Sequence, residues 1–448
     1  MIVPAAGIPL LLARGELSSV ELTRAYLERI DRIDGALGAT FAVARESALA
    51  EAAAADAARA AGAPLGLLHG VPVGIKDNID VAGLPTTVGS SFFPAPAARD
   101  AECVRRLRAA GAVVLAKLAL HELAYGVTCV NRHVHDCRNA WDLRRIPGGS
   151  SAGPGAALAA DLCTITLGTD TGGSVRIPAA LNGVSALRPT PGRVPNDGVF
   201  PVSWTYDVVG PLARSAEDVA LATAALLDPG AADPRERIGA GVRGLRVGVP
   251  QAFFFDDTDP EIVGAVLEAV AVLCAAGATR VALEVPGAER SHEIMRTLIW
   301  SEAYAVHRHR LAEQPERFGD DVRRRLLLGE GVSGADYAAA RDAARAFARS
   351  TQRLFDRVDV IVAPTTGATA PLVADSETIS TTNRLTRATY AWSLAGLPTV
   401  AVPCGCSSDG LPIGMQVAAA PGADAVALGA AAAYQRDTAW HLRRPSYS

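Results

Sequence analysis

Two glycine–serine turns carry the side chains of this sequence that are best suited to covalent catalysis. The first turn, Pro-Gly-Gly-Ser-Ser-Ala-Gly, contains Ser150, and the second, Gly-Thr-Asp-Thr-Gly-Gly-Ser, ends at Ser174, 24 residues later. The glycines leave backbone N–H groups uncovered beside each hydroxyl. Such donors stabilise the oxyanion that forms when a nucleophile attacks a carbonyl. The pattern therefore indicates an oxyanion-binding site next to a serine nucleophile.

A nucleophilic serine needs a base, and lysine is the rare basic residue here. Of the 43 basic residues only Lys76 and Lys117 are lysine, and the other 41 are arginine. Burial can lower the pKa of lysine until it is neutral and accepts a proton, which arginine effectively cannot do. Alternating residues at 71–75 predict a half-buried strand that ends at Lys76. The fragment alone leaves Lys76 open as a base, a surface lysine or the ion-pair partner of Asp77, with Lys117 as the rival base.

The elements around the two turns must bring the serines together. Residues 156–160 have helical composition, and residues 162–167 alternate like a short strand. A helix and a strand in this order can fold back and place both serines at one end of a sheet. Strands and helices also alternate in the rest of the chain, which predicts an α/β layered fold. Further helices are expected at 18–33, 44–62, 100–110, 259–276, 291–312, 333–356 and 424–436, and strands at 112–117, 245–249, 358–363, 398–403 and 412–418.

Three motifs, in order, resemble the amidase signature family: Gly-Ile-Lys-Asp-Asn, Gly-Gly-Ser-Ser-Ala-Gly and Gly-Thr-Asp-Thr-Gly-Gly-Ser-Val-Arg-Ile-Pro. The spacing between the serines is also that of the family. The resemblance implies a Ser–cis-Ser–Lys triad in which Ser174 is the nucleophile, Ser150 the bridging serine after a cis peptide bond, and Lys76 the base. It implies a single α/β/α domain with a large mixed central β-sheet flanked by helices.

The resemblance is strong over about residues 65–215 and returns more weakly near 395–416. It implies one amidase domain over 1–448, with an N-terminal helical arm at 1–64, the signature core at 65–215, and variable substrate-side helices and remaining strands at 240–448. No catalytic motif is found between about 240 and 380.

The second turn is expected to supply the oxyanion hole through the backbone amides of Thr171, Gly172, Gly173 and Ser174. Two residues after the first turn depart from the family pattern, which usually has Gly where Ala152 stands and a small residue where Pro154 stands. Neither departure falls on a triad position.

Several side chains near the motifs are candidates for substrate contact. In relatives the segment of Ala124 and Tyr125 borders the substrate. Trp204 follows a loop-rich stretch of the kind that often faces substrates, and Trp204 and Tyr206 are interpreted as either pocket walls or core.

Two arginines follow the second turn and could bind a carboxylate of the substrate. Arg176 is expected one strand step beyond the nucleophile, pointing away and pairing with an acid, and Arg188 has the same two possible roles. Asp170 is expected to brace the turn.

The second half of the chain offers weaker signals. Trp300, Tyr304 and His307 lie at helical spacing, and we expect them to pack rather than to line a pocket. The loop Pro364–Ser380 has no periodic pattern and is long enough to suggest a role in covering the site.

The composition excludes several classes of function. A net charge of −4 and a pI near 6.1 give no reason to expect nucleic-acid binding. No apolar stretch is long enough for a membrane span, and the N-terminus lacks the basic leader of a signal peptide. Seven scattered cysteines predict thiols in a reducing cytoplasm.

No cofactor or metal is expected. The sequence has no dinucleotide fingerprint, and the spacing of His121, Glu122, His133 and His135 matches no recurring metal-ligand pattern.

Three functions compete. The first is a free-standing amidase that cleaves a small or aromatic carboxylic amide to acid and ammonia or amine; the Arg-Pro-Thr-x-Gly-Arg-x-Pro context resembles amidases that act on arylacetamides. The second is the glutaminase (A) subunit of a tRNA-dependent amidotransferase complex. The third is a non-catalytic binding protein on the amidase fold. The expected partner is a small-molecule amide, and a homodimer is left open.

Overall fold

A computed structural model describes residues 4–376 and 379–446 of the 448-residue chain. Its described strands form one mixed sheet of 11 strands in the order β1-β3-β2-β4-β6-β5-β10-β11-β9-β7-β8. Strand β2 pairs in parallel with β3 and β4, and β7 pairs in parallel with β8 and β9, whereas the other pairings are antiparallel. The strands are β1 (Thr40–Val43), β2 (Pro72–Lys76), β3 (Val113–Leu118), β4 (Ile165–Asp170), β5 (Ser185–Arg188), β6 (Val208–Ala213), β7 (Arg246–Pro250), β8 (Thr279–Leu283), β9 (Val360–Pro364), β10 (Thr399–Cys406) and β11 (Pro412–Ala419).

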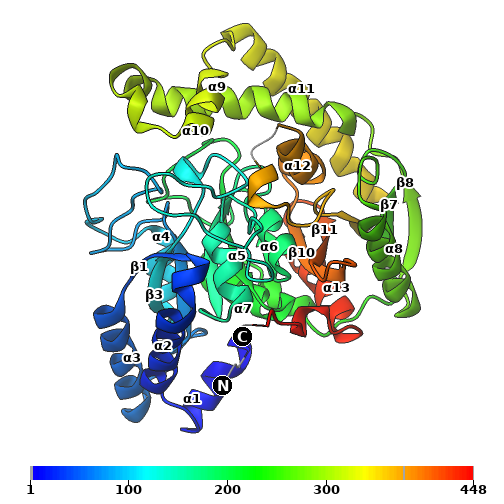
Figure 1. Cartoon of the computed structure of the whole chain (residues 1–448). Helices are drawn as coiled ribbons and strands as arrows, with labels where there is room; N and C mark the ends of the chain where they lie inside the picture. The colour runs from blue at the N-terminus through cyan, green and yellow to red at the C-terminus, as the bar shows by residue number, and fades with distance from the viewer. Residues whose placement is uncertain (1–3, 377–378, 447–448) are drawn as a thin grey trace.

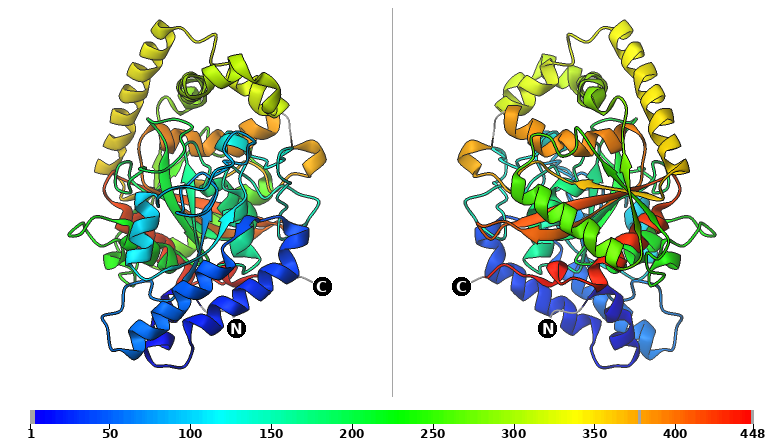
Figure 2. Two further views of the ribbon diagram at one scale, coloured as in Figure 1. Left: turned by 90° about the vertical axis from the view of Figure 1, so that its left-hand side faces the viewer. Right: turned by 90° about the vertical axis from the view of Figure 1, so that its right-hand side faces the viewer.

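Helices cover both faces of the sheet and extend beyond it at two ends of the molecule. Helices α9, α10 and α11 lie at the end opposite α1, α2 and α3 in all three views (Figures 1 and 2). The helices are α1 (Ile8–Ala13), α2 (Ser19–Leu37), α3 (Arg45–Ala60), α4 (Glu102–Ala109), α5 (Ala152–Ala159), α6 (Arg176–Asn182), α7 (Ala216–Leu226), α8 (Pro260–Ala275), α9 (Ser291–Glu313), α10 (Asp320–Leu327), α11 (Gly334–Gln352), α12 (Ile379–Leu394) and α13 (Asp424–Arg436). None of the helices in the described ranges is long and apolar enough to cross a membrane.

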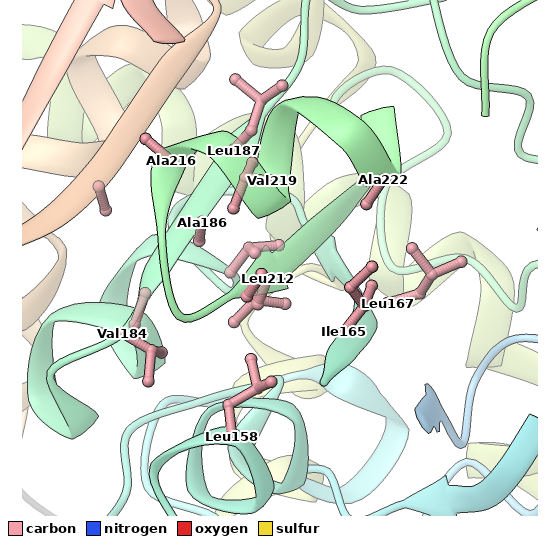
Figure 3. Close-up of a cluster of buried hydrophobic side chains, with 14 of the residues drawn as sticks. Leu158, Ile165, Leu167, Val184, Ala186, Leu187, Leu212, Ala216, Val219 and Ala222 are labelled. Carbon is pink, nitrogen blue, oxygen red and sulfur yellow. The ribbon is translucent and has the colours of Figure 1, made fainter. Parts of the chain in front are cut away.

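The centre of the sheet is buried on both faces. Strands β4, β5 and β6 lie between α5 on one side and α7 on the other, and their apolar side chains fill the space between the two helices (Figure 3). Every residue of β2, β3, β4 and β6 is buried. Strands covered on both faces carry apolar residues at nearly every position, which accounts for the long apolar runs of this sequence.

The helix between the two glycine–serine turns begins earlier than expected. Helix α5 starts at Ala152 rather than near residue 156, and all eight of its residues are buried. Pro154 lies in its first turn, where the missing N–H of proline leaves no intrahelical bond unmade. A Cβ atom on Gly153 would lie 2.4 Å from the carbonyl oxygen of Ala39, so the chain packs here at backbone contact. The family departures at Ala152 and Pro154 are therefore compatible with a regular helix.

The expected helices at 18–33, 44–62, 100–110, 259–276, 291–312 and 424–436 are confirmed to within a few residues, except that the first runs on to Leu37. The expected C-terminal stretch of helix 333–356 is a separate 3-10 turn after Gln352. Helix α2 begins with a capping box, in which Ser18 and Glu21 make both reciprocal hydrogen bonds.

Two expectations about the chain path were wrong, and one helix had not been expected. Arg176 is the first residue of helix α6, not a strand residue. The segment after the loop Pro364–Ser380 is helix α12, and the loop itself contains a 3-10 turn at Val373–Asp375; residues 377 and 378 of that loop lie outside the described residues. The N-terminal arm is not purely helical, because its strand β1 pairs with β3.

Candidate active site

Lys76 lies at the carboxyl end of β2 and is fully buried. Its Nζ donates to Oγ of Ser150 at 2.8 Å and to Oγ1 of Thr169 at 2.7 Å. Strands β2 and β4 are parallel neighbours, so Lys76 and Thr169 both lie at the same edge of the sheet. No carboxylate among the described residues lies within 4 Å of this amine.

Burial lowers the pKa of Lys76 to about 7, although the negative charges of Asp207 and Asp170 act in the opposite direction. Desolvation disfavours the charged ammonium. A substantial fraction of the Lys76 side chains is therefore neutral near neutral pH and can accept a proton from the Ser150 hydroxyl.

The other lysine of the chain is in a different state. Lys117, in β3, forms a buried ion pair of 2.9 Å with Asp77 and also donates to the carbonyl of Pro85. The ion pair with Asp77 that the sequence left open for Lys76 is thus made by Lys117. No described contact joins Lys117 to Ser150 or Ser174. Its amine is instead paired with the carboxylate of Asp77.

Ser150 follows a cis peptide bond from Gly149, as the resemblance implied. A Cβ atom on Gly149 would lie 3.0 Å from the backbone of Gly126 and Val127, so a larger residue would force that backbone to shift by a few tenths of an ångström. The next residue, Ser151, donates its backbone N–H to the carbonyl of Ser174 at 3.1 Å. The two glycine–serine turns are thus in direct contact.

The carboxylate of Asp170 fixes the backbone of the second turn through hydrogen bonds. The carboxylate of Asp170 accepts from the backbone N–H of Gly173 at 2.7 Å and of Val175 at 3.2 Å. It also forms ion pairs with Arg176 at 3.0 Å and Arg188 at 3.1 Å, and all three charged groups are fully buried. Burial would raise the pKa of Asp170, but the two arginines lower it below its usual range.

These contacts bear on two expectations from the sequence, the role of the two arginines and the set of oxyanion donors. Arg176 and Arg188 pair with an acid, and neither lines the cavity described below, so their role is to fix the turn rather than to bind a substrate carboxylate. Gly173 is not an oxyanion donor, because its N–H is directed to Asp170. By contrast, the backbone amides of Thr171, Gly172 and Ser174 make no hydrogen bond within the part of the chain that the structure describes.

Asp207 is a site residue that the sequence analysis missed. Its carboxylate accepts from Oγ1 of Thr171 at 2.5 Å and from the backbone N–H groups of Val202 and Ser203. Burial raises its pKa to about 6, against the effect of these hydrogen bonds and of Lys76. Asp207 therefore connects the second glycine–serine turn to the neighbouring loop and contributes to the electrostatic field at Lys76.

A cavity of about 450 Å³ opens beside the second turn. Thr171, Gly172 and Ser174 line it on the sheet side. Its other walls come from α9, α10 and α12, none of which carries a motif that could have been recognised in the sequence. Because the cavity contacts Ser174, a ligand in it would lie against the proposed nucleophile.

Only some of the candidate substrate residues line the cavity. Ala124 and Tyr125 line the cavity. Trp204 does not, since its side chain is 58% exposed, and the cavity is instead lined by Val202 of the same loop. Tyr206 is buried in the second apolar cluster of the core. The prediction for Trp204 was wrong because the Asp207 carboxylate draws the backbone of Val202 and Ser203 inward and leaves Trp204 outside.

Of the three residues at helical spacing in α9, one lines the cavity and two pack in the core. Trp300 lines the cavity, against the expectation of simple packing. His307 packs between the rings of Phe200 and Phe318, and Tyr304 packs against the same apolar cluster. The described residues of the loop Pro364–Ser380 do not line the cavity; α12 does so through Thr382, Asn383, Thr386 and Tyr390.

The histidines and acids near residue 121 form two separate pairs. His121 lies 3.1 Å from Asp321, and His133 lies 3.2 Å from Glu122, whose carboxylate also accepts from the backbone N–H of Gly319. These pairs join the 121–133 segment to the start of α10. Among the described residues no group of three or more His, Cys, Asp or Glu side chains is arranged to hold a metal ion.

Comparison with known proteins agrees with this geometry. The profile of a family described as Amidase matches residues 21–428. A Pseudomonas putida protein named amidase is 39% identical, with 96% of this chain and 95% of that protein covered. The glutamyl-tRNA(Gln) amidotransferase A subunit of Roseiflexus castenholzii is 38% identical, with 97% and 96% covered. The native peptide amidase of Stenotrophomonas maltophilia superposes with a TM-score of 0.89 at 32% identity, with 99% and 98% covered.

Proposed function

The chain belongs to the amidase family and is a hydrolase of amide C–N bonds, and we propose that it cleaves a small carboxylic amide through an acyl-enzyme on Ser174. The observation that carries this proposal is the 2.8 Å contact between Nζ of Lys76 and Oγ of Ser150. An amine whose pKa is lowered to about 7 by burial is positioned there to take a proton from a serine. Ser174 supports the proposal from the other side, because it lines the cavity while its backbone contacts Ser151.

The mechanism follows from these roles. Neutral Lys76 accepts the proton of Ser150, which in turn accepts the proton of Ser174, and Oγ of Ser174 attacks the amide carbonyl. The tetrahedral oxyanion receives hydrogen bonds from the free backbone amides of Thr171, Gly172 and Ser174. The loss of one such donor typically raises the barrier by about 3 kcal/mol.

Collapse of the tetrahedral intermediate completes the first half of the reaction. The C–N bond breaks, the proton held by Lys76 passes through Ser150 to the leaving nitrogen, and ammonia or an amine departs. Water then attacks the ester on Ser174 and gives up a proton to the same relay, which releases the carboxylic acid and restores the serine. Atoms and protons balance without a cofactor, so the proposal includes none.

Labelling with a fluorophosphonate tests the nucleophile. Mass spectrometry should find the phosphonyl group on Ser174 in the wild-type chain and no label in Ser174→Ala. A screen of aliphatic, aryl and ureido amides for ammonia release then identifies which amides are cleaved. Labelling of another serine, or equal labelling of the Ser174→Ala variant, would overturn the assignment.

The second candidate function is the glutaminase component of a tRNA-dependent amidotransferase. It is supported by the Roseiflexus castenholzii relative, which is nearly as similar to this chain as the Pseudomonas putida amidase. The purified chain separates the two: stable protein that hydrolyses simple amides alone favours the amidase. Light scattering on the same sample distinguishes a monomer from the homodimer left open by the sequence. We place the enzyme in the cytoplasm, where its seven free thiols would stay reduced.

The third hypothesis, a non-catalytic binding protein, disagrees with the match to a family of hydrolases. The labelling of Ser174 tests it as well, because a serine without an activating base reacts poorly with fluorophosphonates.

A further inference from the structure

One wall of the cavity carries a guanidinium group without a carboxylate partner in the described part of the chain. Arg296 projects from α9 into the cavity lining, and its guanidinium carbon lies 5.3 Å from the ring centroid of Trp300. Its Nε is buried without a hydrogen-bond acceptor among the described residues. A buried donor without an acceptor is costly, so this arginine is poised for an acceptor supplied from outside the chain.

The charges that line the cavity do not balance. Arg324 and Arg325 of α10 accompany Arg296, whereas Asp321 is the acid among the described lining residues. Asp321 is already paired with His121 at 3.1 Å and with Arg325 at 3.7 Å. Arg324 makes its described hydrogen bond to a backbone carbonyl one turn earlier. Two positive charges therefore face the cavity without a carboxylate of the described lining to compensate them.

Neighbouring groups do not weaken this excess of positive charge. His292, one turn before Arg296, is neutral at pH 7, since burial and the charges of Arg296 and Arg387 lower its pKa to about 4. Tyr390 and Tyr125 remain protonated, because burial raises the pKa of both phenols. The hydroxyl of Tyr125 is buried without a partner in the described ranges, so it is a second donor that awaits an acceptor.

Two successive ring contacts connect the turn of Ser174 to the part of α9 that carries Arg296. The ring of Tyr390 packs so close to Gly172 that a Cβ atom there would lie 2.4 Å from it. The ring of His292 stacks on Tyr390 with 4.7 Å between centroids. Arg296 follows His292 by one helical turn and lines the same cavity as Ser174. A ligand that reaches both Ser174 and Arg296 must have two ends.

We propose that the cavity binds acidic amides, the monoamides of dicarboxylic acids, with the amide carbon at Ser174 and the carboxylate on Arg296 and the Tyr125 hydroxyl. Apolar side chains of the same lining, such as Ile177, Val202 and Ile299, would contact the hydrocarbon spacer. Charge-assisted hydrogen bonds to a guanidinium are about twice as strong as neutral ones. This inference rests on the proposed hydrolysis at Ser174 and specifies the substrate class of that same site.

The same lining disfavours an ammonium group on the substrate. Asp321 is committed to His121 and Arg325, so no free carboxylate of the described lining can compensate an α-amino group. Glutaramate is glutamine without its α-amino group. We therefore expect glutaramate to be the better ligand of the two, which separates this site from that of a glutaminase.

Hydrolysis kinetics with matched amides test the inference. The acidic series runs from malonamate to adipamate, and each member is paired with the neutral primary amide in which an ethyl group replaces the carboxylate. Wild-type kcat/KM should favour the acidic member at the best chain length. Arg296→Gln should lower the ratio of acidic to neutral kcat/KM by about 30-fold, as for the loss of a charge-assisted contact. Arg296→Lys should retain part of the ratio.

The matched control is Arg308→Gln on the exposed side of the same helix, which removes one arginine charge from α9 without touching the cavity lining. It should leave the acidic-to-neutral ratio at the wild-type value. An equal loss in Arg296→Gln and Arg308→Gln would mean that only the overall charge matters, and it would overturn the proposed contact.

Protection of Ser174 from the fluorophosphonate provides a readout that needs no turnover. Glutarate and adipate should slow labelling of the wild-type chain more than pentanoate and hexanoate do, and glutaramate more than glutamine. This measurement decides the question even if Arg296→Gln does not fold. If Ser174 is not labelled at all, the proposed function fails; if it is labelled but dicarboxylates protect no better than monocarboxylates, the acidic-amide inference fails alone.

Discussion

The amine of Lys117 lies 2.9 Å from the carboxylate of Asp77, and both side chains are shielded from solvent. Lys76, the residue before Asp77, instead directs its amine to two hydroxyl groups. The chain thus uses its two lysines in opposite electrostatic settings, one compensated and one not. Only the uncompensated amine is suited to carry a proton between neutral groups.

Replacement of Lys76 should therefore abolish most of the activity. Lys76→Ala should lower kcat/KM at pH 7 by about 10²–10⁴-fold, the usual contribution of a general base. Lys76→Arg keeps the positive charge but cannot deprotonate, so it should be no more active than Lys76→Ala. Steady-state kinetics on an amide found in the ammonia-release screen measure both. Substantial turnover by the arginine variant would show that charge, not basicity, is required.

The pH dependence of kcat/KM should report the same amine. Because the neutral form of Lys76 is the active one, kcat/KM should rise with pH and level off above a midpoint near 7. Stability should follow the same sign: between about pH 7 and 10.5 the unfolded chain binds a proton at this lysine that the folded chain does not. The free energy of unfolding should then rise with pH across that window, other groups being equal. A flat activity profile from pH 5 to 9 would contradict the assignment.

Asp207 should tune this midpoint. Its negative charge raises the pKa of Lys76, so Asp207→Asn should move the midpoint of the activity profile to lower pH. Loss of the carboxylate acceptors should also loosen Thr171 and the backbone of Val202. The shift of the midpoint is the informative measurement, because a purely structural role would lower kcat without moving it.

Asp170 should be needed for stability. Asp170→Asn leaves Arg176 and Arg188 as buried charges without a carboxylate, and breaking a buried pair in this way typically costs about 3–5 kcal/mol. Thermal and denaturant unfolding should show this loss. The control is Asp409→Asn, whose ion pair with Arg145 is 3.5 Å long with a 70% exposed carboxylate. Its effect should stay within about 0.5 kcal/mol.

Gly172→Ala should disable catalysis without unfolding the chain. The added Cβ would lie 2.4 Å from the ring of Tyr390, so either the ring or the nucleophile turn must move. We expect kcat to fall by at least about tenfold, since displacement of an oxyanion donor alone costs that much or more. Gly264→Ala in α8, where nothing lies within 4 Å of the new atom, is the control and should retain full activity.

The sequence predicted that Lys76 and the two glycine–serine turns would meet at one edge of the sheet, and the contacts of Ser150 and Ser151 agree. Lys76, Ser150 and Ser174 stand in motifs whose glycines and spacing leave few alternatives, and strands at this edge are apolar enough to recognise. The role of Gly173 could not be predicted, because whether an amide points at a substrate or at Asp170 depends on the path of the turn.

The wall of the cavity could not be predicted for a different reason. Helix α12 is rich in threonine, a β-branched residue of modest helix propensity, so its sequence does not identify it as a helix. Arg296 is one of 41 arginines, and its place in the cavity wall is visible only in the folded structure.

Two strands outside the cavity were also missed. Strand β5 is only four residues long, and the edge strand β8 is mostly exposed, so neither shows a clear hydrophobic pattern in the sequence.

The cavity joins two parts of the chain that lie far apart in the sequence. Ser174 and its supports belong to the sheet and its turns, whereas Arg296, Arg324 and Tyr390 belong to helices that follow much later in the sequence. Randomising the lining positions of α9, α10 and α12 is therefore expected to diversify which acyl groups are accepted without altering the proposed proton relay. These helices are the natural starting point for directed evolution of new amide selectivities.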